Sequence, residues 1–313
     1  MSYSRNNGPI LLSVALLLAV TLMIGSLAWP GIGDASSQEN ESPVLVSSIS
    51  ASDARIPIYY TNQVAVLTYH HLDSLENSAT ISAERFREHI QGLHKLGYNF
   101  ISLTQLRDFL ESKKQLPPNA VVITIDDGYD SAYSRALPVL QAEKVPAAVF
   151  MIVGHIGATQ GEIPKLTWDE MDEMQGWGIE FQSHTYDSHA VINDETGRSG
   201  FSLTSRGYVP EAARHETSIE YQDRILYDLQ VSRSILEDRL GAEVQYLALP
   251  FGSHSLSVQE TARRAGYEYV FTVEPGMVSL ASDRFALGRF NAGQAGYQAR
   301  DIHALILSSL KND

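Results

Sequence analysis

The stretch Val121–Asp130, with the sequence VVITIDDGYD, constrains this chain more than any other. Its first five residues are mostly β-branched and apolar, which predicts a strand buried on both faces. The strand ends in two adjacent carboxylates, Asp126 and Asp127, and Gly128 lets the backbone turn so that both can face one crevice. Two neighbouring carboxylates repel when both are ionised, so one is expected to bind a cation or to have a raised pKa.

A structural role is the alternative for the same residues. Asp and Gly are common turn residues, and an aspartate can cap a helix that begins near Ser131. Taken alone, the pair Asp126-Asp127 fits a capped turn as well as a catalytic crevice. The histidines downstream shift the balance.

The composition limits what kind of site the chain can build. It has 313 residues, 44% hydrophobic and 19% charged, which suits one large globular domain or two small ones. The formal net charge is −14 and no stretch is rich in Lys or Arg, which argues against nucleic acid as a partner. There is no cysteine, so disulfides, thiolate metal sites and thiol nucleophiles are excluded. Any metal must be held by His, Asp or Glu.

Residues 1–30 predict a membrane segment. No residue from Asn6 to Gly33 is charged, and about twenty apolar residues are enough to span a bilayer as a helix. We expect an uncleaved anchor over residues 9–29, with Arg5 inside and the rest of the chain outside. The alternative is a signal peptide cleaved near Ser26-Leu27-Ala28, whose apolar region is usually shorter. Either way, the catalytic part is expected to be extracytoplasmic.

The rest of the chain alternates between strand-like and helical segments. Residues 31–61 lack clear periodicity and predict a linker, and residues 62–313 alternate at least six times. This alternation predicts parallel strands with crossover helices, in a closed or nearly closed β/α barrel. Residues 190–213 are too long for an ordinary connection and are expected to form a lip over the site. A long helix is expected to bury Ile219, and a late strand is expected over Phe285–Phe290.

In such barrels the site is built at the carboxyl ends of the strands. The polar clusters of this sequence all stand at those ends. They are Tyr69-His70, Asp126-Asp127, His184–His189 and Pro250-Phe251-Gly252.

His184 and His189 are five residues apart and follow a short predicted strand. On a helix this spacing would set them about 140° apart, so a bent loop must bring them together. One carboxylate and two neutral imidazoles form a common ligand set for a catalytic Zn²⁺. Two loop histidines alone are more often surface residues, but an upstream strand ending in Asp126-Asp127 makes a metal site the favoured interpretation.

Three motifs in order resemble those of the polysaccharide deacetylases with a chitooligosaccharide (nodulation-type) deacetylase domain. They are Thr124–Gly128, His184-Thr185 with a second histidine, and Leu249–Gly252. The resemblance covers roughly residues 64–290. It implies a distorted (β/α)7 barrel that hydrolyses N-acetyl groups on β-linked N-acetylglucosamine.

The same resemblance implies roles for individual residues. Asp126 corresponds to the family's catalytic base, and Asp127, His184 and His189 to its metal ligands. The cofactor is then a divalent metal, with Zn²⁺ favoured and Co²⁺, Ni²⁺ or Fe²⁺ as alternatives. The backbone N–H near Phe251 is expected to stabilise the oxyanion.

The chain departs from most members at several positions. The wider histidine spacing, together with Tyr69-His70 on the first strand, resembles the exported poly-β-1,6-N-acetylglucosamine deacetylases of biofilm systems. In those enzymes the strand with the general acid comes first, which implies that His70 is the acid. The usual Leu-x-His near the carboxyl terminus is absent. Ala248 replaces the arginine that commonly precedes the Pro-aromatic pair, and Arg289 is expected to supply that charge.

Other side chains near the motifs have two interpretations. Tyr129, Tyr186 and Phe251 are expected either to stack on sugar faces or to pack at the barrel mouth. His71 points away from His70 on a regular strand, so we interpret it as structural.

The expected function is metal-dependent removal of acetyl groups from an extracellular N-acetylglucosamine polymer. Poly-N-acetylglucosamine is favoured, with peptidoglycan or a chitin-like glycan next, and the membrane is a second partner through the N-terminal segment. One alternative is a catalytically decayed barrel that binds carbohydrate, which Ala248 supports. Another is a glycosyltransferase that holds a metal–nucleotide with adjacent aspartates, but it has little use for two histidines.

Overall fold

The structure is a computed structural model, and it describes residues 56–159, 163–193 and 198–310. The chain divides into two units, Met1–Asp53 and Ala54–Asp313, and the described residues all belong to the second. The anchor expected over residues 9–29 and most of the expected linker lie outside the described residues. Within the described ranges, no helix has the length and apolar character needed to cross a membrane.

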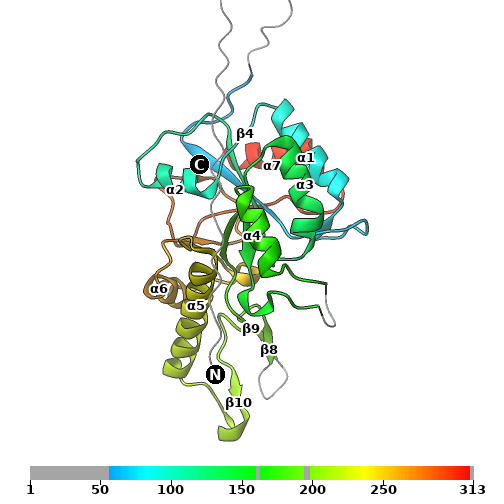
Figure 1. Cartoon of the computed structure of the whole chain (residues 1–313). Helices are drawn as coiled ribbons and strands as arrows, with labels where there is room; N and C mark the ends of the chain where they lie inside the picture. The colour runs from blue at the N-terminus through cyan, green and yellow to red at the C-terminus, as the bar shows by residue number, and fades with distance from the viewer. Residues whose placement is uncertain (1–55, 160–162, 194–197, 311–313) are drawn as a thin grey trace, which may run out of the picture. The chain divides into compact units, whose positions relative to one another are not determined.

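A curled parallel sheet forms the centre of the domain (Figure 1). Its hydrogen-bonded order is β13-β12-β7-β6-β5-β1, and β15 pairs with β1 in parallel. The strands are β1 (Gln63–Tyr69), β5 (Ala120–Ile125), β6 (Ala148–Met151), β7 (Glu180–Ser183), β12 (Tyr246–Ala248), β13 (Tyr269–Phe271) and β15 (Phe290–Asn291). A single bridge from Phe271 to Leu287 joins β13 to the segment that leads into β15, so the sheet curls back toward β1.

The expectation of a late strand over Phe285–Phe290 was wrong, because in this part of the described chain the strand is Phe290–Asn291. The first residues of that segment instead form a turn that begins at Asp283. The Asp283 side chain accepts a hydrogen bond from the N–H of Phe285, and its carbonyl accepts one from Ala286. The barrel is therefore distorted at this seam.

Alternation along β5 and β1 decides which side chains face the barrel interior. Successive residues of a strand point to opposite faces. Val121, Ile123 and Ile125 belong to the outer core between sheet and helices, whereas Ala120 and Val122 belong to the inner core. Asp126 continues the inner series of β5, and His70 continues that of Val64 and Val66 on β1. Both therefore point toward the interior at the carboxyl end of the sheet.

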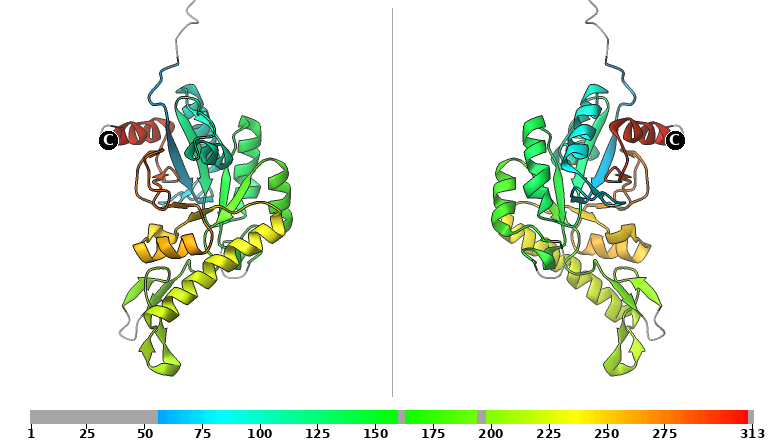
Figure 2. Two further views of the ribbon diagram at one scale, coloured as in Figure 1. Left: turned by 90° about the vertical axis from the view of Figure 1, so that its left-hand side faces the viewer. Right: turned by 90° about the vertical axis from the view of Figure 1, so that its right-hand side faces the viewer.

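Most helices cover the outside of the sheet (Figure 2). They are α1 (Ala83–Lys95), α3 (Leu137–Glu143), α4 (Trp168–Gly176), α5 (Ser218–Leu240), α6 (Leu256–Arg264) and α7 (Ala299–Ser309). A π-helical turn over Ala132–Ala136 precedes α3. The helix α2 (Leu103–Leu110) differs, because its apolar residues pack into the inner core with those of β1 and β6. It closes the barrel at the end opposite the polar clusters.

Two small hairpins occupy the insertion between β7 and α5. They are β8 (Val191–Asn193) with β9 (Ser199–Phe201), and β10 (Tyr208–Val209) with β11 (Arg214–His215). Except for β11, they lie in the segment 190–213 that was expected to form a lip. The first turn of α5 projects with these hairpins beyond the sheet (Figure 1), so Ile219 is exposed and the expectation that it is buried was wrong.

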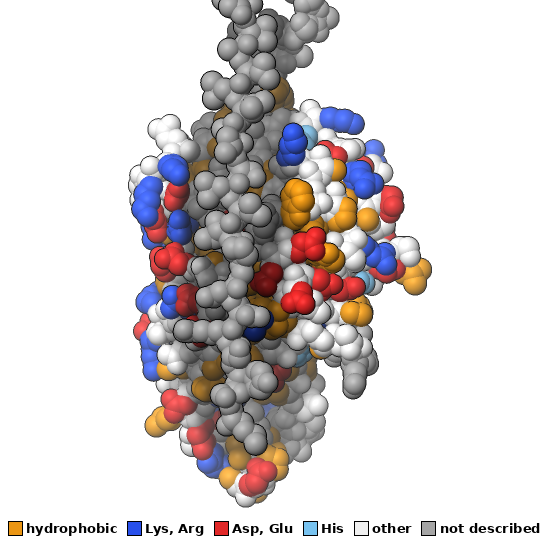
Figure 3. Space-filling view, in the orientation of Figure 1, with side chains coloured by type: hydrophobic (Ala, Val, Ile, Leu, Met, Phe, Trp, Pro, Cys, Tyr) orange, Lys and Arg blue, Asp and Glu red, His pale blue; other side chains and the backbone are white. Residues whose placement is uncertain are grey.

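Charges of both signs are visible on one face of the described surface. On the face seen in Figure 3, acidic and basic side chains are interspersed rather than gathered into a basic stripe.

Asn119, which directly precedes β5, binds the segment that leads into β1. It is 1% exposed, with a φ of 53° that Asn tolerates better than most residues. Its Oδ1 accepts hydrogen bonds from the N–H groups of Tyr59 and Tyr60, at 2.7 and 3.3 Å. Its Nδ2 donates to the carbonyls of Pro57 and Gly97, at 2.8 and 3.1 Å. The amide thus uses both its donors and its acceptor.

We predict that Asn119→Ala lowers the free energy of unfolding by about 2–4 kcal/mol, because buried backbone groups lose partners and alanine strains at positive φ. Denaturant unfolding measures the change. Asn62→Ala is the matched control, since Asn62 has a φ of 56° but is exposed. An equal loss in both variants would mean that the hydrogen bonds of Asn119 contribute nothing beyond its backbone conformation.

Candidate functional site

Asp127, His184 and His189 converge at the carboxyl ends of β5 and β7. One potential ligand atom from each lies within 4.8 Å of the other two. The Oδ1 atom of Asp127 is 3.4 Å from Nε2 of His184 and 3.2 Å from Nε2 of His189. Asp127 and His184 are buried, and His189 is partly buried. These are the three residues that the sequence proposed as metal ligands.

The donor atoms of this group fit a divalent metal. Nδ1 of His184 lies 2.8 Å from the carbonyl oxygen of Ala248, which can only accept, so Nδ1 carries a proton, and in the neutral imidazole Nε2 has the lone pair. Oδ1 of Asp127 is buried and has no hydrogen-bond partner among the described residues. A buried carboxylate oxygen facing imidazole lone pairs is costly unless a cation lies between them. The group could therefore hold a metal ion.

The local charges favour a cation at the same point. Burial lowers the pKa of His184, but its contact with Asp127 and the charge of Asp126 together raise that pKa above its ordinary value. Burial also opposes ionisation of Asp127, yet the two histidines hold its pKa well below the usual range. The site thus stabilises positive charge near an ionised Asp127.

Asp228 on α5 holds the bend that brings the two histidines together. Its two carboxylate oxygens accept hydrogen bonds from the N–H groups of Tyr186 and Asp187, at 3.0 and 2.8 Å. The residue after His184, Thr185, has a φ of 73°, which a β-branched residue rarely adopts. Asp228 was not among the residues predicted from the sequence. Its signal was an acidic residue beside Leu229 on the buried side of an amphipathic helix.

The turn that carries Asp127 is fastened by Lys165. Asp127 has a φ of 72°, and a Cβ on the next residue, Gly128, would lie 2.5 Å from Cε of Met151. Lys165 is buried, and its ammonium donates to the carbonyl of Asp127 at 3.1 Å. The same ammonium lies 3.6 Å from the centre of the Tyr129 ring. Lys165 was not predicted from the sequence, because a lone lysine in a loop belongs to no pattern.

Asp126 forms a buried ion pair with Arg289. The two guanidinium Nη atoms donate to the two carboxylate oxygens, both at 2.8 Å, and the Arg289 and Asp126 side chains are 1% and 2% exposed. The Nε atom donates to the carbonyl of Thr272 at 3.0 Å. Burial raises the pKa of Asp126, but the charge and hydrogen bonds of Arg289, together with the charges of His184 and His70, outweigh it and keep that pKa below the ordinary value. Arg289 therefore lies where the charge missing at Ala248 was expected.

His70 lies beside the two aspartates and is half-buried. Its Nδ1 atom is buried and has no hydrogen-bond partner within the described ranges. Burial lowers the pKa of His70, while the charges of Asp126 and Asp127 oppose that shift. The adjacent His71 faces elsewhere, with its Nδ1 2.9 Å from Oγ of Ser131, which agrees with a structural role.

An aromatic stack borders the group on another side. The ring of Phe251 lies 4.5 Å from that of His189, and the ring of Phe201 stacks on Phe251 at 4.6 Å. Phe201 comes from the hairpin β8–β9 and was not predicted. Tyr186, one of the expected stacking residues, instead packs against the outer core.

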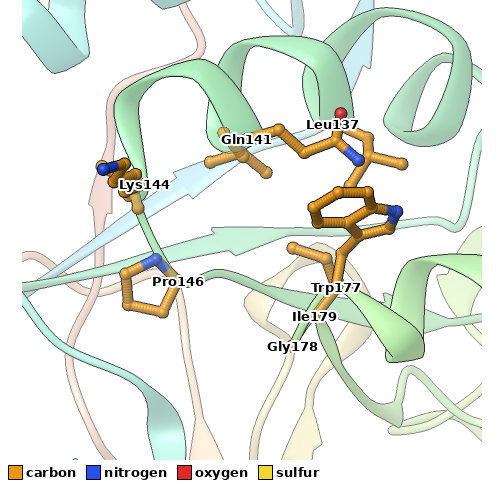
Figure 4. A pocket seen from close by; sticks show the side chains of 9 residues that line it. Leu137, Gln141, Lys144, Pro146, Trp177, Gly178 and Ile179 are labelled. Carbon is orange, nitrogen blue, oxygen red and sulfur yellow. The ribbon is translucent and has the colours of Figure 1, made fainter. Parts of the chain in front are cut away.

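Among the hollows lined by the described residues, two lie at opposite ends of the strands. One of about 380 Å³ adjoins the group formed by Asp127, His184 and His189, called the metal group below. This hollow is lined by Asp127, Tyr129, Ile152, His155, Ile163, Lys165 and His189. A larger one of about 460 Å³ lies where α3 and α4 lead into β6 and β7, beside Trp177 and Pro146 (Figure 4). None of the predicted site residues lines the larger hollow, so the smaller one is the candidate for ligand binding.

The chain matches the family model for polysaccharide deacetylase over residues 113–270. This chain belongs to the polysaccharide deacetylase family. The resemblance predicted from the three motifs is therefore confirmed.

Among curated proteins, the chain is similar to the poly-beta-1,6-N-acetyl-D-glucosamine N-deacetylase of Escherichia coli (strain K12). The two are 29% identical over 215 residues, which is 64% of this chain and 32% of that protein. The protein of the same name from Staphylococcus epidermidis is 26% identical over 212 residues, which is 67% of each chain. The chain thus spans about a third of the length of the Escherichia coli relative.

Solved structures agree on the fold. A de-N-acetylase from Aggregatibacter actinomycetemcomitans superposes with a TM-score of 0.70 at 24% identity, covering 78% of this chain and 100% of that one. IcaB from Ammonifex degensii gives 0.64 at 24% identity, covering 78% and 97%. The predicted fold class, a distorted (β/α)7 barrel of the polysaccharide deacetylase type, is confirmed.

We predict that Arg289→Met lowers the free energy of unfolding by about 3–5 kcal/mol, because it leaves the carboxylate of Asp126 buried without its partner. Adding Asp126→Asn should recover part of the loss, since the remaining group is then neutral. Denaturant unfolding of both variants measures this. Arg300→Met is the control, because Arg300 is exposed in its pair with Asp301. An Arg289→Met variant as stable as the parent would contradict the ion pair.

Asp228→Ala should weaken metal binding by roughly 10–100-fold, as changes to residues that support metal ligands commonly do. The reason is that the loop from His184 to His189 loses both hydrogen bonds from α5. Calorimetric titration of Zn²⁺ into metal-free protein measures the affinity. Asp223→Ala, an exposed change on the same helix, is the control. Equal affinities for the two variants would show that Asp228 does not position the ligands.

Proposed function

We propose that this chain is a metal-dependent N-deacetylase that acts on an N-acetylglucosamine polymer outside the cytoplasm. Poly-β-1,6-N-acetylglucosamine is the favoured substrate, ahead of peptidoglycan and chitin-like glycans. The observation that carries the proposal is the convergence of the Asp127–His184–His189 group with the Asp126–Arg289 pair and His70. Family membership supports the reaction class, and the curated relatives support the polymer.

Asp127, His184 and His189 would hold the metal. Zn²⁺ is the favoured ion, because two imidazoles and one carboxylate suit it and leave a coordination position open. When bound, such an ion acts as a Lewis acid toward the acetamido carbonyl and the attacking water. The remaining roles belong to the chain's own side chains.

Asp126 would act as the general base. The two hydrogen bonds from Arg289 fix the plane of its carboxylate and keep it ionised, so that it can accept a proton at neutral pH. Each carboxylate oxygen has further lone-pair capacity beyond the one used by Arg289. The pair thus orients the base without consuming all of its acceptor capacity.

His70 would act as the general acid. An amide nitrogen leaves as an amine only if it is protonated, and His70 lies beside the carboxylates with its Nδ1 unpartnered among the described residues. The backbone N–H of Phe251 would stabilise the developing oxyanion. The rings of Phe251 and Tyr129 would contact the sugar at the mouth of the site.

The location outside the cytoplasm rests on residues 1–30. An apolar segment over residues 9–29 would anchor the protein to the membrane, or its cleavage would release the domain. In both cases the catalytic domain would meet its polymer on the outer side.

A catalytically decayed carbohydrate-binding barrel is the alternative that Ala248 suggested. The bidentate contact between Arg289 and Asp126 weakens it, because the charge absent at position 248 is supplied from another segment. With that charge present, no member of the proposed catalytic set is missing from the described site.

We predict different losses for the two aspartates. Asp126→Asn removes only the proton acceptor, so turnover should fall by ~10²–10⁴-fold while the metal stays bound. Asp127→Asn removes an anionic ligand, so metal affinity should fall and added metal should restore part of the rate. Acetate release from the three polymers and calorimetric metal titration measure both effects. His70→Ala should resemble Asp126→Asn.

Each outcome decides a named role. Loss of metal in Asp126→Asn with retention in Asp127→Asn would exchange the two roles. Near-normal turnover in His70→Ala would remove the proposed acid. No acetate from any of the three polymers with the metal-loaded parent protein would overturn the proposed function itself.

A further inference from the structure

Phe201 and Phe251 form an exposed aromatic wall beside the metal group. Their rings stack with centroids 4.6 Å apart and planes 18° apart, and Phe251 also contacts His189 at 4.5 Å. Phe201 is 39% exposed and Phe251 43% exposed. An exposed stack of large apolar rings that continues directly from a proposed metal ligand indicates a binding surface rather than a core.

Phe201 belongs to the insertion rather than to the barrel. It is the last residue of β9 and pairs with Val191 of β8, the first strand after the histidine loop. Phe251 belongs to the turn that follows β12. The wall is therefore assembled from two separate segments, and the insertion extends the site beyond the strand ends.

Hydrogen bonds and an ion pair attach the insertion to α5 after Phe201. Arg224 of α5 donates to the carbonyls of Ser202 and Ser205, at 3.2 and 3.0 Å. It also forms an ion pair with Glu216, at 2.7 Å, near the end of the insertion. Because Ser202 follows Phe201 directly, these contacts restrain the backbone next to Phe201.

The backbone of Phe251 supports a binding role. Its φ is 56°, in the left-handed region that a bulky residue rarely adopts. Such strain persists only where the surroundings enforce it, and it is common at binding sites. Here the strained turn places the ring between His189 and Phe201.

A β-linked hexosamine ring suits this wall. Its substituents are equatorial, so each face presents axial C–H groups that pack on an aromatic ring. The wall carries no charge, and it is continuous with the metal group through the contact between Phe251 and His189. Its occupant is therefore expected to be part of the molecule whose acetyl group reacts.

We propose that Phe201 is a specificity-determining residue that binds the sugar next to the one being deacetylated, so that the site selects chains over single sugars. This inference rests on the proposed function and deepens it by naming a subsite. It assigns the insertion between β7 and α5 a purpose in substrate recognition.

The test compares chain lengths. Acetate release is measured with the metal-loaded full chain on methyl β-N-acetylglucosaminide and on the β-1,6-linked tetrasaccharide. For the tetrasaccharide, Phe201→Ala and Phe201→Leu should raise KM by roughly 3- to 10-fold with kcat unchanged, because a flat stacking surface is lost. For the single sugar, KM should not change. Phe201→Tyr, which keeps the ring, should behave like the parent.

A binding measurement checks folding and turnover effects separately. In an Asp126→Asn background, calorimetric titration with the tetrasaccharide should show the same weakening, roughly 3- to 10-fold, for Phe201→Leu. Trp177→Ala is the matched control, because Trp177 is 63% exposed but lines the hollow at the other end of the strands (Figure 4). This control should leave both constants unchanged.

Three outcomes would overturn the inference while the parent protein still releases acetate. The first is that the parent and Phe201→Leu have equal KM and Kd values for the tetrasaccharide. The second is that Trp177→Ala weakens tetrasaccharide binding as much as Phe201→Leu does. The third is that Phe201→Leu raises the KM for the single sugar as much as that for the tetrasaccharide. Sedimentation with phosphatidylglycerol–phosphatidylcholine vesicles tests separately whether the wall binds lipid. Vesicle binding that depends on Phe201, with KM unaltered, would make the wall a lipid contact instead.

Discussion

The buried ion pair between Asp126 and Arg289 is the contact on which the rest of the site depends. Two charges with side-chain exposures of 2% and 1% lose most of their hydration, which costs several kcal/mol per ion and requires well-formed partners. Both carboxylate oxygens and all three guanidinium nitrogens have such partners. The pair joins β5 to the segment after β13, across the seam where the sheet curls back to β1. The same contact thus completes the barrel interior and orients the proposed base.

Three residues with a strained backbone lie at the candidate site. Asp127, Thr185 and Phe251 all have positive φ values, and all three border the metal group or the wall beside it. Neighbours from other segments restrain these turns, as Lys165 does at the carbonyl of Asp127. A site whose ligands are fixed in this way needs little rearrangement when a metal or substrate binds. The energy stored in these conformations is supplied by packing elsewhere in the domain.

The helix α5 connects the metal group to the insertion. Near its middle, Asp228 binds the loop that carries both histidines, and one turn earlier Arg224 binds the segment that follows Phe201. One helix therefore contacts both the loop of the proposed metal ligands and the segment next to the aromatic wall. A change in the position of α5 would therefore move the proposed metal ligands and the proposed sugar-binding wall at the same time.

Sequence by itself determined the family, the fold class and the candidate site group of this protein, whereas only the tertiary structure decided what supports that site. The run Val121–Asp130 and the pair His184 and His189 are local patterns, and strand periodicity directs Asp126 and His70 inward without knowledge of the partner strands.

Predictions from local pattern were wrong at Ile219 and at Phe285–Phe290. Ile219 lies beyond the end of the sheet, and a turn at Asp283 replaces the start of the expected strand. Lys165, Asp228 and Phe201 stand in no motif, and Lys165 reaches Asp127 over 38 positions while Asp228 reaches Tyr186 over 42. The sequence predicted that Arg289 replaces the charge missing at Ala248, but its bidentate geometry depends on a separation of 163 residues. Local periodicity carries information about which face a residue takes, whereas contacts of this range exist only after the sheet has closed and the helices have packed.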